Sequence, residues 1–173
     1  MRVFVPVAVA VLLVACGVGC GTDEPAAREG EHAILDATGA RLFVPREVRR
    51  IVTTVPGQSE MVRVLGAGDL LVGVSERDPA VEGPSAPARI PTWPSISAER
   101  VAARSPDLVL VDRTLSAHDL PGLRGRFRGA FACDSASLDA LSTTFERLGE
   151  ALGRPAEAAA LSGLEVYGVL SVR

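Results

Sequence analysis

The fold is decided by residues 49–75, RRIVTTVPGQSEMVRVLGAGDLLVGVS. Within this stretch, residues 50–55 are rich in β-branched side chains and predict a strand that stops at Pro56. A short helix is expected next, because apolar residues recur at helical spacing until Gly66 ends the pattern. Residues 70–74 predict a second strand. A strand, a helix and a strand in this order indicate a parallel pair, and therefore an α/β domain.

The segments on either side of this unit extend the same pattern. A third strand is expected at 108–111, which is apolar on both faces and is therefore placed at the centre of the sheet. A long loop rich in Pro, Ser, Ala and Glu separates the second and third strands. The remaining predicted elements are a β-hairpin at 33–45, a helix from Ser97 to about Arg104, a short strand at 131–133, an amphipathic helix at 137–152 and a last helix from Pro155.

The N-terminus is typical of an export signal. Twelve apolar residues, 3–14, follow the single charge of Arg2, which predicts a signal peptide over residues 1–15. Leu13-Val14-Ala15-Cys16 resembles a bacterial lipobox, which makes Cys16 the predicted lipidation site; the alternative is an ordinary signal peptide with incidental cysteines. Residues 16–33 predict a flexible tether. The expected location is the periplasm or the outer face of the cell membrane, with a lipid anchor.

Composition excludes several classes of function. All 18 basic residues are Arg and the formal net charge is −3, which argues against a nucleic-acid partner and a Walker-type phosphate loop. The two histidines and Cys133 are not spaced as metal ligands, so we expect no metal site and no cofactor. Cys133 is expected to be a small core residue. Residues 57–61, Gly-Gln-Ser-Glu-Met, begin like a nucleophile elbow but lack its last glycine, so hydrolase activity is the least favoured function.

Taken in order, the motifs resemble a known family. The stretches 49–75 and 90–112, IPTWPSISAERVAARSPDLVLVD, are similar to the N-terminal lobe of the periplasmic substrate-binding proteins that serve ABC importers of iron siderophores, haem and vitamin B12. The motifs that carry this resemblance are Asp36 to Arg41, Pro56 to Glu60, Leu65-Gly66, Val72-Gly73-Val74, Ser97-Ala98-Glu99 and Pro106 to Val109.

The resemblance implies a three-layer lobe at 34–154, with a mainly parallel sheet flanked by helices and an N-terminal β-hairpin. Residues 155–173 would begin the helix that joins two lobes in this family. The second lobe is missing, so the chain is expected to be a fragment, a frameshifted product or a single-lobe derivative. The change to glycine and β-branched residues near Ser162 fits a lost reading frame best.

The resemblance also implies the ligand-binding residues. Trp93 falls where the vitamin B12 protein has a tryptophan in its cleft; alternatively, it covers the lobe's own core. Arg77 lies in a loop that often contacts ligand and would suit an anionic ferric chelate, or it is a solvated loop charge. Pro56 and Gln58, in the turn after the first strand, complete the predicted ligand-binding set.

Glu99 matches the glutamate that meets the ABC permease in this family; the alternative is a carboxylate that only stabilises its helix dipole. The predicted function is therefore a lipid-anchored solute-binding component of an ABC importer, with a small-molecule iron chelate or a corrinoid as ligand and no enzymatic activity. One lobe alone should bind ligand at millimolar affinity or undetectably. The main alternative is a folded remnant that binds nothing usefully.

Overall fold

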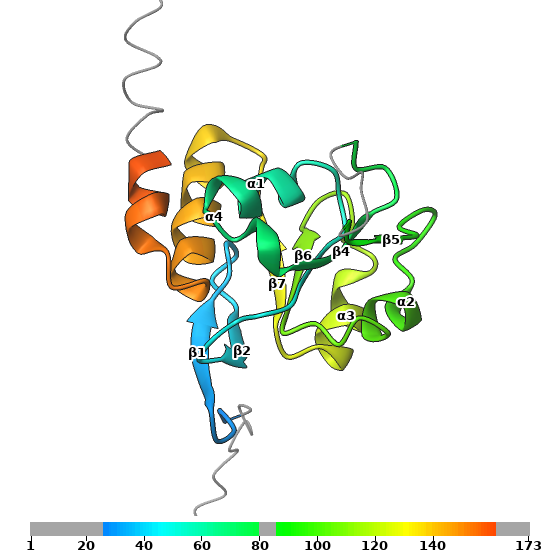
Figure 1. The fold of residues 1–173 in the computed structure, drawn as a ribbon, viewed down its shortest axis with the longest axis horizontal. Helices are drawn as coiled ribbons and strands as arrows, with labels where there is room; N and C mark the ends of the chain where they lie inside the picture. Colours follow the sequence, from blue (N-terminus) through cyan, green and yellow to red (C-terminus); the bar gives the residue numbers. More distant parts are fainter. Residues whose placement is uncertain (1–25, 80–85, 162–173) are drawn as a thin grey trace, which may run out of the picture.

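The computed structural model describes residues 26–79 and 86–161, which form a β-hairpin and a parallel sheet with helices on both faces (Figure 1). The elements in chain order are β1 (Glu31–Leu35), β2 (Arg41–Pro45), β3 (Ile51–Thr53), α1 (Gln58–Val64), η1 (Gly68–Leu70), β4 (Leu71–Ser75), β5 (Ala88–Ile90), α2 (Ala98–Ala102), β6 (Leu108–Asp112), α3 (Leu120–Arg126), β7 (Ala130–Cys133) and α4 (Leu138–Ala151). Residues 155–161 are also helical. The three-layer α/β architecture predicted from the sequence is thus confirmed.

The parallel sheet has the strand order β5-β4-β3-β6-β7. β3 and β6 lie side by side, and Ile51 pairs with Leu108 while Thr53 pairs with Leu110. Every residue of β6 is buried, as its apolar sequence predicted. The middle strand is nevertheless β3, because the chain adds β4 and β5 on one side of it and β6 and β7 on the other.

Strand periodicity divides the core into two layers. Successive side chains of a strand point to opposite faces of the sheet. One core cluster joins alternate residues of β3 and β6 to α1 and α4, and it includes Ile51, Leu108, Leu110, Val62 and Leu148. The other cluster takes the intervening residues and joins them to α2 and α3; it includes Val52, Val109, Val111, Val101 and Leu123. α4 and α3 accordingly lie on opposite sides of the sheet (Figure 1).

The hairpin β1–β2 closes the outer edge of β7. Ala37 N donates to Ala132 O over 3.2 Å, and Phe43 N donates to Arg128 O over 3.2 Å. The buried Asp36 carboxylate accepts hydrogen bonds from Thr38 N, Ala40 N and Ala132 N, at 2.8, 3.0 and 3.2 Å. Asp36 therefore shapes the hairpin turn and fastens it to the sheet at the same time.

Some local predictions differ from the structure. β1 begins at Glu31, two residues earlier than predicted, and so includes His32. β5 and α3 were not predicted at all. In α4, the apolar Leu138 is exposed, although an amphipathic helix is expected to bury its apolar residues, and the polar Thr144 is buried. The hydrogen bonds of its hydroxyl to the backbone of Asp134 offset the cost of burying it.

The predicted signal peptide, the lipidation site at Cys16 and most of the tether lie outside the described residues, as does the end of the predicted inter-lobe helix after residue 161. Within residues 26–79 and 86–161, no helix is both long enough and apolar enough to cross a bilayer.

Candidate functional site

The order of the strands indicates where a functional site is expected. From β3 the chain proceeds first to β4 on one side and later returns to β6 on the other, so the direction of winding changes between β3 and β6. In open parallel sheets, ligands bind outside the carboxyl ends of the strands at such a switch point. The topology therefore directs attention to the residues that follow β3, β6 and β7.

A cavity of about 500 Å³ opens at this position, between α1 and α4. Ligand pockets commonly fall in the range of about 300–1,000 Å³. The cavity is lined by the turn after β3, by the ends of β6 and β7 and by one side of α4, and its residues include Pro56, Gln58, Asp112, Cys133, Asp134 and Phe145. Two of the predicted ligand-binding residues, Pro56 and Gln58, thus lie in one cavity.

Gln58 shapes the turn beneath the cavity. Its Oε1 accepts hydrogen bonds from Thr54 N at 3.0 Å and from Val55 N at 3.2 Å, which holds the backbone where β3 ends. Its Nε2 is buried, and the amide group interacts with the Cys133 thiol. Gln58 is therefore a polar residue in an otherwise largely apolar part of the wall.

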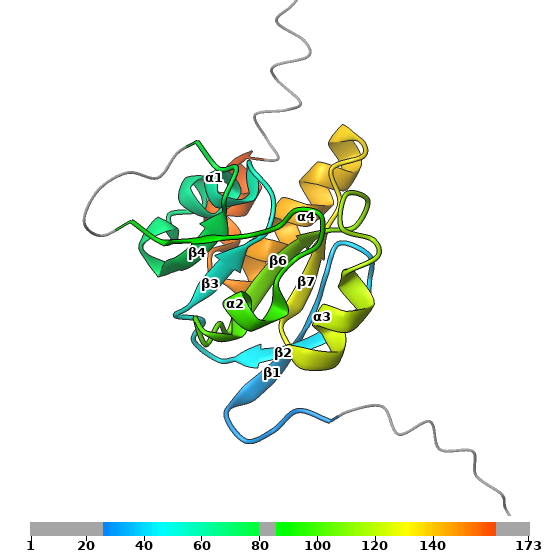
Figure 2. The same ribbon diagram turned by 90° about the vertical axis from the view of Figure 1, so that its right-hand side faces the viewer.

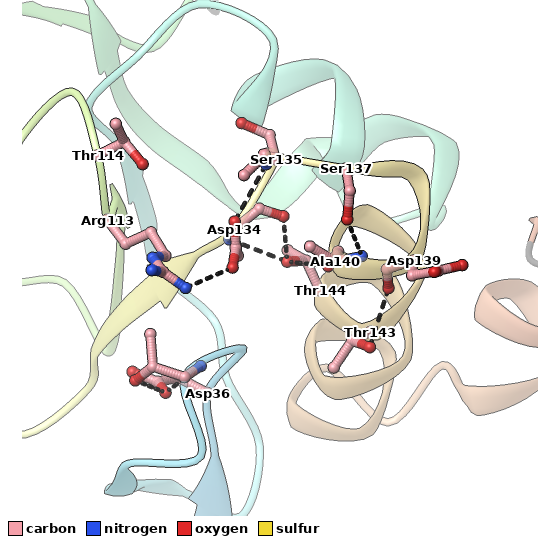
Figure 3. A network of polar contacts seen from close by, with 12 residues as sticks. Asp36, Arg113, Thr114, Asp134, Ser135, Ser137, Asp139, Ala140, Thr143 and Thr144 are labelled. Atoms are coloured by element: carbon pink, nitrogen blue, oxygen red, sulfur yellow. Dashed lines mark hydrogen bonds and ion pairs between the residues drawn. The ribbon is translucent and has the colours of Figure 1, made fainter.

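Two aspartates that sequence reasoning missed complete the polar side of the cavity. Asp112 ends β6, and its Oδ1 accepts from Thr114 N and Leu115 N at 2.9 and 2.8 Å. Asp134 follows β7 and pairs with Arg113 over 2.6 Å (Figure 3). Both could have been found from the sequence, because each is a carboxylate placed at the carboxyl end of a buried strand.

The loop after β7 is tied to α4 by a buried hydroxyl. Thr144 Oγ1 accepts from Asp134 N at 3.0 Å and lies 2.8 Å from Asp134 O, to which it donates (Figure 3). Ser137 caps the same helix by accepting from Ala140 N at 3.1 Å. These bonds fix α4 as the wall of the cavity, on the side opposite α1.

Trp93 and Arg77 form a second part of the same edge, although neither lines the cavity. Arg77 follows β4 and Trp93 follows β5, so both stand at carboxyl ends of the parallel sheet. The Arg77 guanidinium lies 5.2 Å from the centre of the Trp93 ring. Trp93 is 68% exposed, so the alternative that it covers the core of the lobe is wrong.

The loops that carry this pair are joined to each other. Ser75 Oγ and Thr92 Oγ1 are 3.1 Å apart, and Thr92 N donates to Glu76 Oε1 over 3.2 Å. An aromatic face with a cation above it is therefore held at the rim of the site.

Glu99 lies away from the cavity, in the first turn of the short helix α2. Ser97 caps this helix as predicted, its Oγ accepting from Arg100 N at 3.4 Å. The Glu99 side chain is 79% exposed, and it faces Arg126 Nη1 at 3.4 Å. This position leaves the carboxylate accessible to a partner.

Solved structures similar to this chain include siderophore-, vitamin B12- and haem-binding proteins. The siderophore-binding protein BauB, solved with acinetobactin and ferric iron, matches 83% of this chain and 55% of its own at 14% identity, with a TM-score of 0.66. The vitamin B12-binding protein BtuF of Vibrio cholerae matches 67% of this chain and 46% of its own at 25% identity, with a TM-score of 0.55. A periplasmic haem-binding protein of Pseudomonas aeruginosa matches 70% of this chain and 44% of its own at 26% identity, with a TM-score of 0.56.

The chain has the fold of the periplasmic solute-binding proteins of siderophore, haem and vitamin B12 importers. The resemblance read from the motifs is confirmed by these structures. The chain spans about half the length of the solute-binding proteins it matches. No family profile matches the sequence, and no curated protein matches it by sequence comparison.

The candidate nucleophiles of this solute-binding fold are occupied by structural contacts. Ser59, in the incomplete elbow motif, is buried and donates its hydroxyl to Asp78. Cys133 is buried, as predicted, and burial raises the pKa of its thiol far above the usual range. Among residues 26–79 and 86–161, no group of three His, Cys, Asp or Glu side chains could hold a metal ion.

Proposed function

We propose that this chain is the solute-binding component of an ABC importer for an iron complex, such as a ferric siderophore or haem, or for cobalamin. The observation that carries the proposal is the cavity at the switch point between β3 and β6, with the exposed pair Trp93 and Arg77 at the same sheet edge. The proteins of similar fold bind ligands of these three kinds. The chain acts as a binding module and catalyses no reaction.

The chemistry of the edge suits a large, partly planar ligand. An exposed indole ring can bury 150–250 Å² against a macrocycle or an aromatic chelate, at little cost in side-chain entropy. Arg77 adds a cation that can pair with ligand carboxylates or phenolates. Asp112 and Asp134, on the polar side of the cavity, already accept hydrogen bonds from backbone N–H groups or from Arg113. Their role is therefore to stabilise the cavity wall.

Calorimetric titration of the 173-residue chain with an anionic ferric chelate, haemin and cobalamin tests the proposal. One of these ligands should bind with a Kd of roughly 1 mM, because this lobe covers only one side of it. Arg77→Gln should weaken binding of an anionic ligand roughly tenfold, whereas Arg147→Gln, which does not line the cavity, should not. The absence of heat from all three ligands at millimolar concentration would favour the folded remnant.

Export with a lipid anchor on Cys16 is the second part of the proposal. Its support is the lipobox-like sequence Leu13 to Cys16 at the end of the apolar run. A diacylated and N-acylated cysteine supplies more than the single chain that gives only marginal membrane binding. Mass spectrometry of the exported protein should find this modification. An unmodified N-terminus at Gly21 or later would contradict it.

Docking to the permease through Glu99 is the third part, and the exposure of this carboxylate supports it. Glu99→Gln should leave the free energy of unfolding nearly unchanged but weaken binding to the permease in proteoliposomes, most strongly at low salt. Arg126→Gln separates the two roles, because it removes the intramolecular partner of Glu99 and leaves the carboxylate in place. Unchanged permease binding by Glu99→Arg would remove Glu99 from the interface.

A further inference from the structure

A cluster of arginines lies away from the ligand edge, near the start of β7. A cavity of about 480 Å³ between β2 and the end of α3 is lined by five arginines, Arg28, Arg41, Arg124, Arg126 and Arg128. None of the described residues that line it is Asp or Glu. This concentration is unusual for a chain with a formal net charge of −3. From it we infer that the cavity binds the phosphate-bearing headgroups of an anionic lipid membrane.

Two of the five arginines are fixed from behind. Arg128 donates from Nε and Nη2 to the Glu31 carboxylate at 2.9 to 3.2 Å, and its guanidinium lies 4.6 Å from the centre of the Phe43 ring. Arg124 pairs with the buried carboxylate of Asp36. The Nε of Arg124 is buried and has no hydrogen-bond acceptor among the described residues. Arg124 and Arg128 are therefore held in place at the inner wall of the cavity, and Arg124 Nε still has a hydrogen to donate.

The other three arginines stand at the rim, where a membrane can reach them. Arg28 and Arg41 are exposed, and Arg126, also exposed, has Glu99 at the long distance of 3.4 Å. Guanidinium groups suit phosphate because their planar array of donors matches its oxygens. Each basic residue near an anionic membrane contributes on the order of 1 kcal/mol to attraction.

The position of the cavity identifies the membrane as the occupant. Arg128 Nη2 donates to Ala26 O over 2.7 Å, so the cavity lies where the described chain begins, and Figure 2 shows that this end of the hairpin is far from α1 and α4. Nine residues, 17–25, separate Cys16 from Ala26, and the ten steps between the two span at most about 35 Å when fully extended. If Cys16 is anchored as proposed above, the arginine cavity is the part of the lobe held nearest to the bilayer.

The two cavities lie at opposite ends of β7. Arg128 and Gly129 precede the strand, whereas Cys133 and Asp134 at its other end line the ligand cavity. Contact of the arginines with headgroups would therefore leave the ligand cavity uncovered. Contact with headgroups would orient the protein as well as strengthen its attachment.

Partition between vesicles and water tests this inference. The full chain carrying Cys16→Ser, so that it cannot be acylated, is mixed with phosphatidylcholine vesicles with or without about 30 mol% phosphatidylglycerol. The apolar run at 3–14 can enter either kind of vesicle, so the quantity measured is the ratio of the two partition coefficients. The triple variant Arg28→Gln, Arg41→Gln and Arg126→Gln should lower this ratio on the order of 100-fold.

A matched control removes the same charge elsewhere. The control variant combines Arg100→Gln, Arg104→Gln and Arg147→Gln, three arginines that do not line the cavity. It should change the ratio of partition coefficients by less than about twofold. Raising the salt concentration should abolish the preference of the unsubstituted chain, which tests the electrostatic origin without any substitution. An equal loss in both triple variants, or no preference for phosphatidylglycerol, would overturn the inference.

A free phosphate ligand would give a different result. Displacement by millimolar inorganic phosphate, but not by sodium chloride of equal ionic strength, would overturn the assignment to membranes. The ligand titration proposed above is independent of these vesicle experiments, because Arg77 and Trp93 are unchanged in every variant. Failure of the one proposal is thus distinguishable from failure of the other.

Discussion

At the scale of single residues, the carboxylates are the side chains that organise this lobe. Asp36 holds the hairpin turn, Asp112 holds the loop after β6, and Asp134 holds the start of the connection to α4. Each accepts backbone N–H groups close to it in the sequence, which is the pattern expected of aspartates in turns. Their roles could be predicted from position, since each stands in a turn or at the end of a strand.

Glu31 makes the free energy of unfolding depend on pH. The backbone N–H of Arg28 donates to its carboxylate and the Arg128 guanidinium pairs with it, so its pKa lies below the ordinary value of 4.5. A lowered pKa contributes stability that is present above about pH 4.5 and is lost as the pH falls through the folded-state value. Glu31→Gln should therefore flatten the loss of stability on acidification.

Urea unfolding of both proteins between about pH 7 and about pH 3 measures this difference. The unsubstituted chain is the reference, and the comparison uses the slope of unfolding free energy against pH. Equal slopes in this range would show that the Glu31 contacts contribute nothing to acid stability.

At the scale of elements, prediction succeeded where periodicity was long or buried. The β3, α1 and β4 unit and the helix α4 were found because apolar spacing and caps agreed. β5 was missed because its three residues end a loop rich in Pro and Ser. α3 was missed because its sequence, LPGLRGR, contains a proline and two glycines, which disfavour helix; burial of Leu123 in the core overrides this preference.

The hydrogen bonds between Thr144 of α4 and the loop after β7 give a prediction at the scale of elements. Thr144→Val keeps the shape of the side chain but leaves the buried N–H of Asp134 without its acceptor, so the unfolding free energy should fall by about 1 to 3 kcal/mol. Thr143→Val is the matched control, because this exposed hydroxyl bonds only Asp139 O within its own helix. Chemical denaturation compares the two. A similar small effect of both substitutions would contradict a specific role for Thr144.

At the scale of the whole molecule, the lobe separates its two surfaces along the strand direction. Ligand-edge residues lie at the carboxyl ends of the parallel strands, and the five arginines gather near the start of β7. The sequence predicted the fold and the motif residues, because these depend on local patterns. It did not predict the stacking of Arg77 on Trp93 or the arginine cavity, because each depends on how residues far apart in the chain meet.

The central claim is that ligand binds at the carboxyl edge of the sheet, and the intrinsic fluorescence of Trp93 tests it most directly. Trp93 is the only tryptophan in the chain, and it stands exposed at that edge beside Arg77. Titration with the ligand that gives heat in calorimetry should quench this fluorescence saturably, with the same millimolar Kd and in excess of the quenching of free N-acetyltryptophanamide. Calorimetric binding that leaves the Trp93 signal no different from that of the free indole would place the ligand elsewhere and contradict the account.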